Sequence, residues 1–275
     1  MKAIIPAAGH GTRFYPVAKS IPKEMLPIGA KPAIQLIVEE ALAAGADEVI
    51  IVTSPDKPTI QRYFSPAEEL KARLSKKAEV CAAMEEVEKI AKRITFVYQH
   101  EQLGLGHAIL QAEPLLRDET DPILILLGDA LVKSEVVCSC AMAQLSACFG
   151  NASVVGLECV PVEKLSRYGV VGGEKTDVED LYKLTTLVEK PKPEEAPSNL
   201  AIAGRYLLHP AIFRYLKACK PSQGGEIQLT DAIQALLHEY PVYGYQYPGK
   251  RFDIGNPDGY LETLLGFNSK ARREC

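Results

Sequence analysis

Two cations and a glycine-rich turn stand close together near the start of the chain. Gly9 and Gly11 follow a short apolar run, Arg13 comes next, and Lys23 lies ten residues further on. Glycines let backbone N–H groups approach phosphate oxygens, and the cations neutralise phosphate charge. A tight structural turn would explain the glycines but not the cations. The sequence therefore predicts a polyphosphate-binding site.

Two common nucleotide-binding motifs do not fit this turn. A dinucleotide-binding loop needs a third glycine where the chain has Phe14, and an acidic residue ending the second strand where it has Thr53. A P-loop needs Gly-Lys-Ser/Thr, whereas Gly11 is followed by Thr12 and Arg13. An NAD-binding protein and an ordinary P-loop ATPase are both excluded.

The elements around the turn predict a parallel sheet in the first half of the chain. Residues 3–5 and 48–53 have the pattern of buried strands, and a helix starting at Pro32 connects them. Such a βαβ unit implies a parallel sheet. Further strands are predicted over 94–99 and 122–127, and an apolar helix follows residues 104–107 and ends at Leu116.

Three polar segments leave these strands at one edge of the predicted sheet. They are residues 8–13, 99–107 and 128–129, the last of which is Gly-Asp. Ligands of open α/β sheets bind outside the carboxyl ends of the strands. The convergence of the three segments therefore indicates the site more strongly than any one motif.

The second half of the chain has a less regular, more antiparallel pattern. Strands are predicted over 152–159, 167–173, 181–189, 201–208 and 242–247, and helices over 134–149, 210–219, from 225–231 and from 257. Residues 66–93 are charged and helix-prone. They suit either a solvated helical hairpin packed on the sheet edge or a surface for a partner.

Composition excludes several other classes of protein. The 275 residues carry a net charge of −4, which argues against a nucleic-acid binder. No apolar run reaches the ~18 residues of a membrane span, and the amino terminus lacks a signal-peptide layout. Seven cysteines, among them Cys275, form no CxxC pair, and five histidines form no HxxxH pair. We therefore expect a cytoplasmic protein with reduced thiols, no zinc site, and no membrane or nucleic-acid partner.

The motifs occur in an order that resembles the sugar-1-phosphate nucleotidyltransferases. Within that superfamily the chain is most similar to the bacterial-type UTP–glucose-1-phosphate uridylyltransferases, or UDP-glucose pyrophosphorylases. The resemblance covers nearly all 275 residues. It rests on residues 6–13, 22–27, 31–32, 99 with 104–107, 127–129, 168–169, 189–191, 204–206, 225–231 and 253–255.

The resemblance implies a fold and an activity. The fold would be a three-layer α/β/α sandwich with a mainly parallel, Rossmann-like central sheet and a smaller sugar-binding lobe. Residues 1–150 would form the nucleotide-binding half and 151–275 the sugar-phosphate-binding half of one continuous domain. The enzyme would use Mg²⁺ to make UDP-glucose and pyrophosphate from UTP and glucose 1-phosphate, as a homodimer or homotetramer.

The resemblance also assigns roles to individual residues. The main chain of Ala8, Gly9, Gly11 and Thr12 would hold the nucleotide, with Arg13 and Lys23 on the triphosphate and Glu24, Gln99 and Gly104 facing the base. Asp129 and Asp253 would hold Mg²⁺, Gly169 and Glu189 would meet the sugar hydroxyls, and Lys190 the sugar phosphate. Arg13, Lys23, Asp129 and Lys190 would be catalytic.

The chain departs from its relatives at two of these motifs. Ala130 follows Asp129 where uridylyl members often have a second Asp, and His10 stands where relatives often have an apolar or basic residue. Two alternative functions stay open. One is the same chemistry on dTTP or on another hexose 1-phosphate. The other is a non-catalytic regulatory protein that binds a nucleotide sugar.

Overall fold

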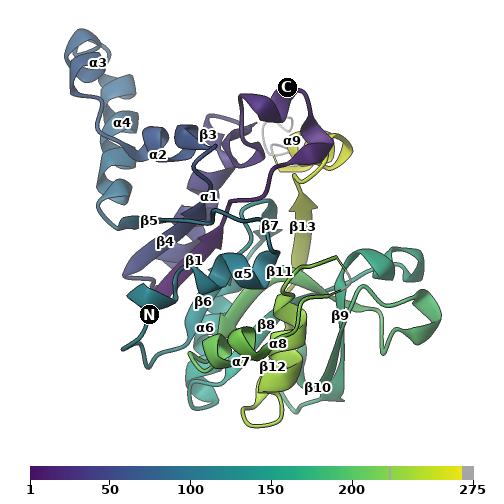
Figure 1. Cartoon of the computed structure of the whole chain (residues 1–275). Coiled ribbons are helices and arrows are strands. Elements are labelled where there is room, and N and C mark those ends of the chain that lie inside the picture. The colour runs from purple at the N-terminus through teal and green to yellow at the C-terminus, as the bar shows by residue number, and fades with distance from the viewer. Residues whose placement is uncertain (223, 268–275) are drawn as a thin grey trace.

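A nine-stranded sheet runs through the part of the chain that the computed structural model describes, residues 1–222 and 224–267 (Figure 1). Its order is β5-β4-β1-β6-β11-β8-β12-β10-β9. These strands are β1 Lys2–Pro6, β4 Glu48–Thr53, β5 Ile94–Tyr98, β6 Ile123–Leu126, β8 Ser153–Cys159, β9 Gly169–Lys175, β10 Leu181–Glu189, β11 Leu200–Leu208 and β12 Val242–Gln246. Because β11 lies between β6 and β8, the sheet is continuous from the first half of the chain to the second.

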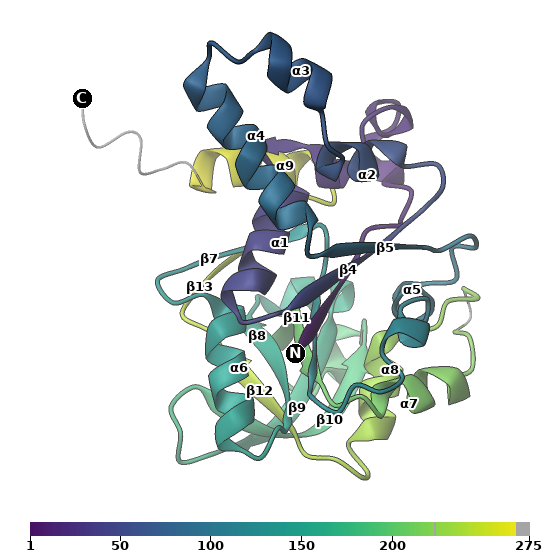
Figure 2. The same ribbon diagram turned by 90° about the vertical axis from the view of Figure 1, so that its left-hand side faces the viewer.

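Helices cover both faces of this sheet and give three layers. Successive strand residues point to opposite faces, so Ala3 and Ile5 enter one apolar core while Ile4 enters the other. The first core is closed by α1 Ala33–Ala43, α2 Pro58–Phe64, α4 Ala78–Ala91 and α6 Cys138–Cys148, and the second by α5 Leu105–Leu110, α7 Ile212–Ala218 and α8 Leu229–Leu236. Figure 2 shows α1 and α6 on one side of the sheet and α5, α7 and α8 on the other.

The prediction of a mainly parallel sheet is corrected by the strand pairing. Strands β5, β4, β1 and β6 are parallel, as the buried apolar runs of the first half predict. β11 runs antiparallel to both β6 and β8, and β10 antiparallel to both β12 and β9. The fold is a mixed α/β fold, because β11 and β10 each run antiparallel to both of their neighbours, whereas β12 pairs parallel with β8.

A small second sheet was not predicted from the sequence. β7 Ala130–Ser134 pairs antiparallel with β13 Gly249–Asp253, and the register places Asp253 opposite Ala130. A third pairing joins β2 Pro27–Ile28 to β3 Lys31–Pro32. The last helix, α9 Pro257–Phe267, follows β13 directly and lies beside it (Figure 1). The β7–β13 ladder therefore places residues 249–253 beside the strand that directly follows Asp129.

The charged segment 66–93 forms a helical hairpin, as predicted. Its helices are α3 Glu68–Arg73 and α4, and Lys71 bridges them through Glu85 and Glu88. Ile90 at the base of α4 enters the first core, whereas α3 projects away from the body in both ribbon views (Figures 1 and 2). Packing on the sheet edge is thus confined to the base of the hairpin.

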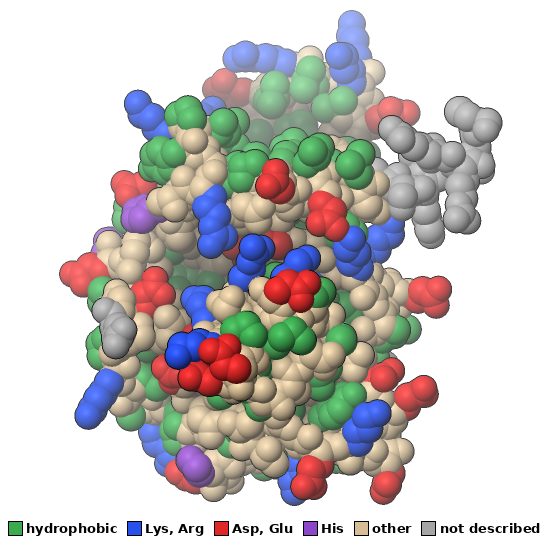
Figure 3. Space-filling model, turned by 90° about the vertical axis from the view of Figure 1, so that its right-hand side faces the viewer, with side chains coloured by type: hydrophobic (Ala, Val, Ile, Leu, Met, Phe, Trp, Pro, Cys, Tyr) green, Lys and Arg blue, Asp and Glu red, His purple; other side chains and the backbone are tan. Residues whose placement is uncertain are grey.

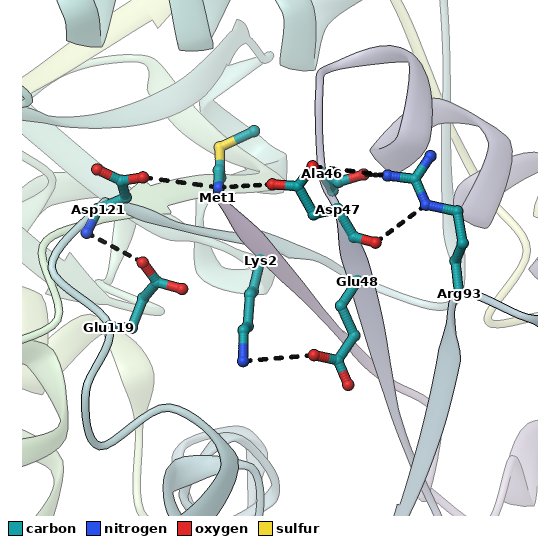
Figure 4. A network of polar contacts seen from close by, with 8 residues as sticks. All are labelled: Met1, Lys2, Ala46, Asp47, Glu48, Arg93, Glu119 and Asp121. Carbon is teal, nitrogen blue, oxygen red and sulfur yellow. Dashed lines mark hydrogen bonds and ion pairs between the residues drawn. The ribbon is translucent and has the colours of Figure 1, made fainter.

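A polar network closes the amino ends of the parallel strands (Figure 4). The Met1 ammonium lies 3.1 Å from Asp47 and 3.6 Å from Asp121, and Lys2 pairs with Glu48. Arg93 donates to the carbonyl of Ala46 at 2.6 Å. These contacts leave the carboxyl ends of the strands as the open edge of the sheet.

Six cysteines are free thiols, and Cys275 lies outside the described residues. In the described part of the chain, no helix is long and apolar enough to cross a membrane.

Candidate functional site

A cavity of about 460 Å³ opens at the carboxyl edge of the parallel strands. The opening turn after β1, the segment after β5 and the Gly-Asp pair after β6 all contribute to its wall, as the convergence of these segments predicts. The second half of the chain adds Glu189, Lys190 and Gln228. The cavity is therefore built from both halves.

A second hollow of about 190 Å³ adjoins the first and shares Asp129 and Glu189 with it. Figure 3 shows Lys and Arg side chains around a hollow in the face that carries β9 and β13. The larger cavity is lined by Ala8, Gly9, Gly11, Thr12, Lys23, Glu24, Gln99, Gly104, Asp129, Glu189 and Lys190, and the smaller by Arg13, Gly169, Asp129, Glu189 and Asp253. The structure thus brings together all the residues that the sequence singled out.

The turn that the sequence predicts to bind phosphate is made of short 3₁₀ turns rather than a helix. Arg13 lies in the turn Thr12–Phe14 and Lys23 in the turn Lys23–Met25. The Lys23 ammonium donates to Asp129 Oδ2 at 2.5 Å. Arg13 lines the smaller hollow instead, so the two cations stand on different sides of the Asp129 carboxylate.

The contact between Lys23 and Asp129 fixes the charges of both groups. Burial acts to lower the pKa of Lys23, but the neighbouring carboxylates of Asp129 and Glu24 outweigh it and raise the pKa. Burial acts to raise the pKa of Asp129, but the Lys23 ammonium outweighs it and lowers the pKa. Both groups are therefore charged at neutral pH.

The two carboxylates expected to bind metal face one point. A methyl group built on Gly255 would lie 2.8 Å from Asp253 Oδ1 and 3.2 Å from Asp129 Oδ2. Asp253 Oδ1 also accepts the backbone N–H of Gly255, and the carbonyl of Asp129 accepts the N–H of Ile254. The described residues contain no group of three or more His, Cys, Asp or Glu that could hold a metal ion. This arrangement fits Mg²⁺, which commonly takes one or two carboxylates and completes its shell with substrate phosphate oxygens.

The far end of the larger cavity carries a polar amide in a tight pocket. Gln99 is 2% exposed, and its amide nitrogen lies 3.3 Å from the carbonyl of Gly104 and 3.0 Å from His107 Nδ1. Its amide oxygen has no partner among the described residues. Gly104 has a φ of +93°, and a Cβ there would meet Glu226 at 2.8 Å. Only glycine fits this position, and the backbone itself forms the wall.

The residues expected to meet the sugar phosphate are Gly169, Glu189 and Lys190, which lie beside α8 and include an unusual backbone conformation. Thr230 donates to Glu189 Oε2 at 2.6 Å, and a Cβ on Gly169 would meet both groups within 3.2 Å. Lys190 has a φ of +45°, which non-glycine residues rarely adopt, and its ammonium lies 3.2 Å from Glu189 Oε1. Strain of this kind often accompanies a functional position.

The two residues that depart from the family motifs, His10 and Ala130, lie in different parts of the site. His10 is exposed at the wall of the larger cavity. Ala130 is 3% exposed and lines the smaller hollow beside Gly204. A carboxylate at position 130 would therefore stand in the smaller hollow, and in this chain a methyl group takes its place.

Sequence reasoning missed several polar residues of the site. Gln228, Tyr206 and Arg251 line the hollows, and Arg251 stacks on Tyr168 at 4.5 Å and pairs with Glu158. Tyr206 and Gln228 lie in segments 204–206 and 225–231, which carry the resemblance, but the sequence assigned no role to either side chain. Arg251 lies in a stretch that has an ordinary structural explanation.

Lys57 was also missed. It follows β4 at the same sheet edge and binds the Glu24 carboxylate. Here the signal was available, since the rule that drew attention to the other strand ends applies equally to β4.

The nucleotidyl transferase family model matches residues 2–269. A UTP–glucose-1-phosphate uridylyltransferase of Pseudomonas aeruginosa is 42% identical over 271 residues, which cover 95% of this chain and 94% of that protein. The Bacillus subtilis protein of the same name is 43% identical over 270 residues, which cover 97% of this chain and 90% of that protein.

Solved structures agree with these relatives. A UDP-glucose pyrophosphorylase complexed with UDP-glucose is 39% identical, with 98% of both chains covered and a TM-score of 0.85. A UTP-bound UGPase from Acinetobacter baumannii is 35% identical, with 99% of this chain and 94% of that chain covered and a TM-score of 0.86.

Proposed function

The chain belongs to the nucleotidyl transferase family, and within it to the UTP–glucose-1-phosphate uridylyltransferases, and we propose that it transfers the uridylyl group of UTP to glucose 1-phosphate, releasing pyrophosphate and UDP-glucose. One observation from the structure of this protein supports the proposal most directly. The cavity with the phosphate-binding turn and the hollow with the sugar-side residues meet at Asp129 and Glu189. Two substrates bound in these spaces would have their reacting phosphates at the junction.

The chemistry of this reaction needs positioning rather than a general base. An oxygen of the sugar phosphate attacks the α-phosphorus of UTP, the new P–O bond forms, and the bond to pyrophosphate breaks. The attacking oxygen is already ionised at neutral pH. The main obstacle is repulsion, since two like charges about 4 Å apart repel by about 4 kcal/mol at an effective dielectric constant of ~20. Cations at the junction offset this repulsion.

On the nucleotide side, the opening turn would bind the triphosphate. The main chain of Ala8, Gly9, Gly11 and Thr12 lines the larger cavity together with Lys23, which supports binding of phosphate oxygens there. Arg13 would neutralise phosphate charge from the smaller hollow. At the far end, the free amide oxygen of Gln99 is suited to accept the N3–H of uracil against the Gly104 backbone, with the chain of Glu24 forming part of the wall.

On the sugar side, the residues of the second half would hold glucose 1-phosphate. The Glu189 carboxylate, oriented by Thr230, is suited to accept hydrogen bonds from sugar hydroxyls, and Gly169 leaves room for the ring. The Lys190 ammonium would bind the sugar phosphate. This assigns the nucleotide to the half before residue 150 and the sugar phosphate mainly to the half after it.

Asp129 and Asp253 would hold Mg²⁺ at the junction. The bound ion would supply positive charge to the phosphate oxygens as the phosphorus centre is attacked. Asp253 is already oriented by the Gly255 N–H, and Asp129 is held in its charged form by Lys23. The ammonium of Lys23 would pass to phosphate oxygens when the nucleotide enters.

Initial rates with five nucleoside triphosphates against three hexose 1-phosphates, read as pyrophosphate release, test the proposal. We expect UTP with glucose 1-phosphate to give the highest kcat/KM, and no release without Mg²⁺. A preference for dTTP or another hexose 1-phosphate would contradict the substrate assignment. Binding of UDP-glucose without pyrophosphate release from any pair would contradict catalysis. The expected homodimer or homotetramer stays a prediction, which sedimentation tests.

A further inference from the structure

Lys57 is a buried cation that lines neither cavity. It follows β4, caps the amino end of α2 and is 7% exposed. Its backbone is fixed by a turn, in which the N–H of Lys57 donates to the carbonyl of Ser54 at 2.9 Å. A charged side chain is seldom buried unless partners compensate its lost hydration.

The Lys57 ammonium has three oxygen partners, which match its three donors. It donates to the carbonyl of Ala7 at 2.8 Å and to the two carboxylate oxygens of Glu24 at 3.1 and 3.0 Å. Burial lowers the pKa of Lys57 and raises that of Glu24, and their mutual attraction opposes both shifts. Because Glu24 is 1% exposed, its carboxylate has little access to a ligand.

The partners of Lys57 belong to the two segments that form the phosphate-binding turn. Ala7 directly precedes the loop of Ala8, Gly9 and Gly11, and Glu24 directly follows Lys23. The stretch between them is exposed at Arg13 and from Tyr15 to Val17, so the described core does little to fix it. Lys57 is a direct polar link from these two segments to the rigid sheet.

We propose that Lys57 is a positioning residue for UTP, which ties the backbone at Ala7 to Glu24 and thereby sets the spacing between the glycine loop and Lys23. The inference rests on the proposed function. It assigns the Glu24 carboxylate to positioning, in place of the direct base contact expected from the sequence. A displacement of about 1 Å in such a site costs on the order of a hundredfold in rate.

Three variants test the proposal. Lys57→Met removes the ammonium but leaves Glu24 buried without a partner, so it also loses thermal stability. The double variant Lys57→Met/Glu24→Met removes both charges and keeps the volume, and we expect it to fold. Glu24→Gln keeps an oxygen for Lys57. Lys92→Met, at an exposed lysine that ends α4, is the matched control.

The measurements are thermal unfolding, calorimetric titration with UTP in MgCl₂, and KM values for both substrates. We expect the folded double variant to bind UTP at least tenfold more weakly and to show a raised KM for UTP, with the KM for glucose 1-phosphate within about twofold. Lys92→Met should bind UTP within about threefold of the parent protein, since it lies away from the link. Glu24→Gln should lie between the parent protein and the double variant, since it keeps one oxygen for Lys57 but loses the charge.

Three results would overturn the proposal. One is unchanged UTP affinity in the double variant. The second is an equal rise in both KM values, which would indicate a general loss of structure. The third is a Glu24→Gln variant as impaired as the double variant, which would assign the carboxylate to direct contact with the nucleotide. Absence of pyrophosphate release from the parent protein would instead refute the proposed function.

Discussion

Replacing Lys190 by alanine isolates the sugar-phosphate side of the site. The side chain of Lys190 is 53% exposed and its nearest partner is Glu189 at 3.2 Å, so the fold itself depends little on the ammonium. A hydrogen bond to a charged group contributes roughly 1.5–3 kcal/mol, and solvent screening at such exposure favours the lower end. Since ~1.4 kcal/mol corresponds to a factor of ten, we expect the KM for glucose 1-phosphate to rise about tenfold.

The same substitution should leave UTP almost untouched. We expect the KM for UTP to change by less than about twofold, because the residues proposed to bind the triphosphate belong to the turn after β1, whereas Lys190 directly follows β10. Steady-state rates with one substrate varied and the other saturating give both values. Lys192→Ala is the control, since Lys192 is an exposed lysine of the same loop that lines neither cavity. An unchanged KM for glucose 1-phosphate, or an equal rise in the control, would refute the assignment.

The backbone conformation of Lys190 allows the effect of strain on stability to be separated from the effect of losing the ammonium on the KM. At a φ of +45° alanine is strained whereas glycine is not, so Lys190→Gly should be more stable than Lys190→Ala by up to about 1 kcal/mol. Both variants lack the ammonium and should share the raised KM. Denaturant unfolding of the pair measures the difference, and a less stable glycine variant would contradict the strain argument.

Three further substitutions test other parts of the structure. Asp129→Asn should abolish Mg²⁺-dependent turnover, because it removes one of two metal carboxylates and the partner of Lys23; rates against Mg²⁺ concentration check this, and full activity would refute the metal role. Gln99→Leu should reduce the preference for UTP over CTP, because cytosine lacks the N3–H that the amide oxygen would accept. Competition kinetics with the two nucleotides measure this preference, and an unchanged preference would contradict the proposed contact of Gln99 with the base. Arg205→Met should destabilise the fold by about 3–5 kcal/mol, because it leaves Glu40 without its buried partner; denaturant unfolding measures this, and a loss below about 1 kcal/mol would contradict it.

The parallel half of the sheet and its open edge could be predicted because they depend on local patterns. The apolar runs before Gly9 and before Asp129 are too short for membrane spans and too continuous for surface strands, so burial in a parallel sheet is their natural interpretation. The strand ends then fix which loops share an edge. The order of apolar runs and polar strand ends thus places residues from three distant parts of the sequence at one site.

The β7–β13 ladder could not be predicted in the same way. β13 has the sequence Gly-Lys-Arg-Phe-Asp, in which only Phe252 is buried, so it lacks both a continuous apolar run and a clear alternation. Its strand character comes from its partner Ala130–Ser134, more than a hundred residues away in sequence. Such pairing depends on tertiary context, which local propensity does not contain. The buried Arg205 was not recognised for a related reason, since its burial becomes evident only when its partner Glu40 is known.

The last helix belongs to the site although none of its described residues lines either cavity. Phe252 on β13 packs edge to face on Phe267 of α9 at 5.7 Å, and a Cβ on Gly266 would meet the Phe252 ring at 2.5 Å. Phe252 directly precedes Asp253, and β13 pairs with the strand that follows Asp129. α9 therefore supports β13 next to Asp253, and the ladder places Asp253 beside the strand that follows Asp129. Because the sheet also continues across both halves, the ladder and the sheet are two independent connections between the segments that carry Asp129 and Asp253.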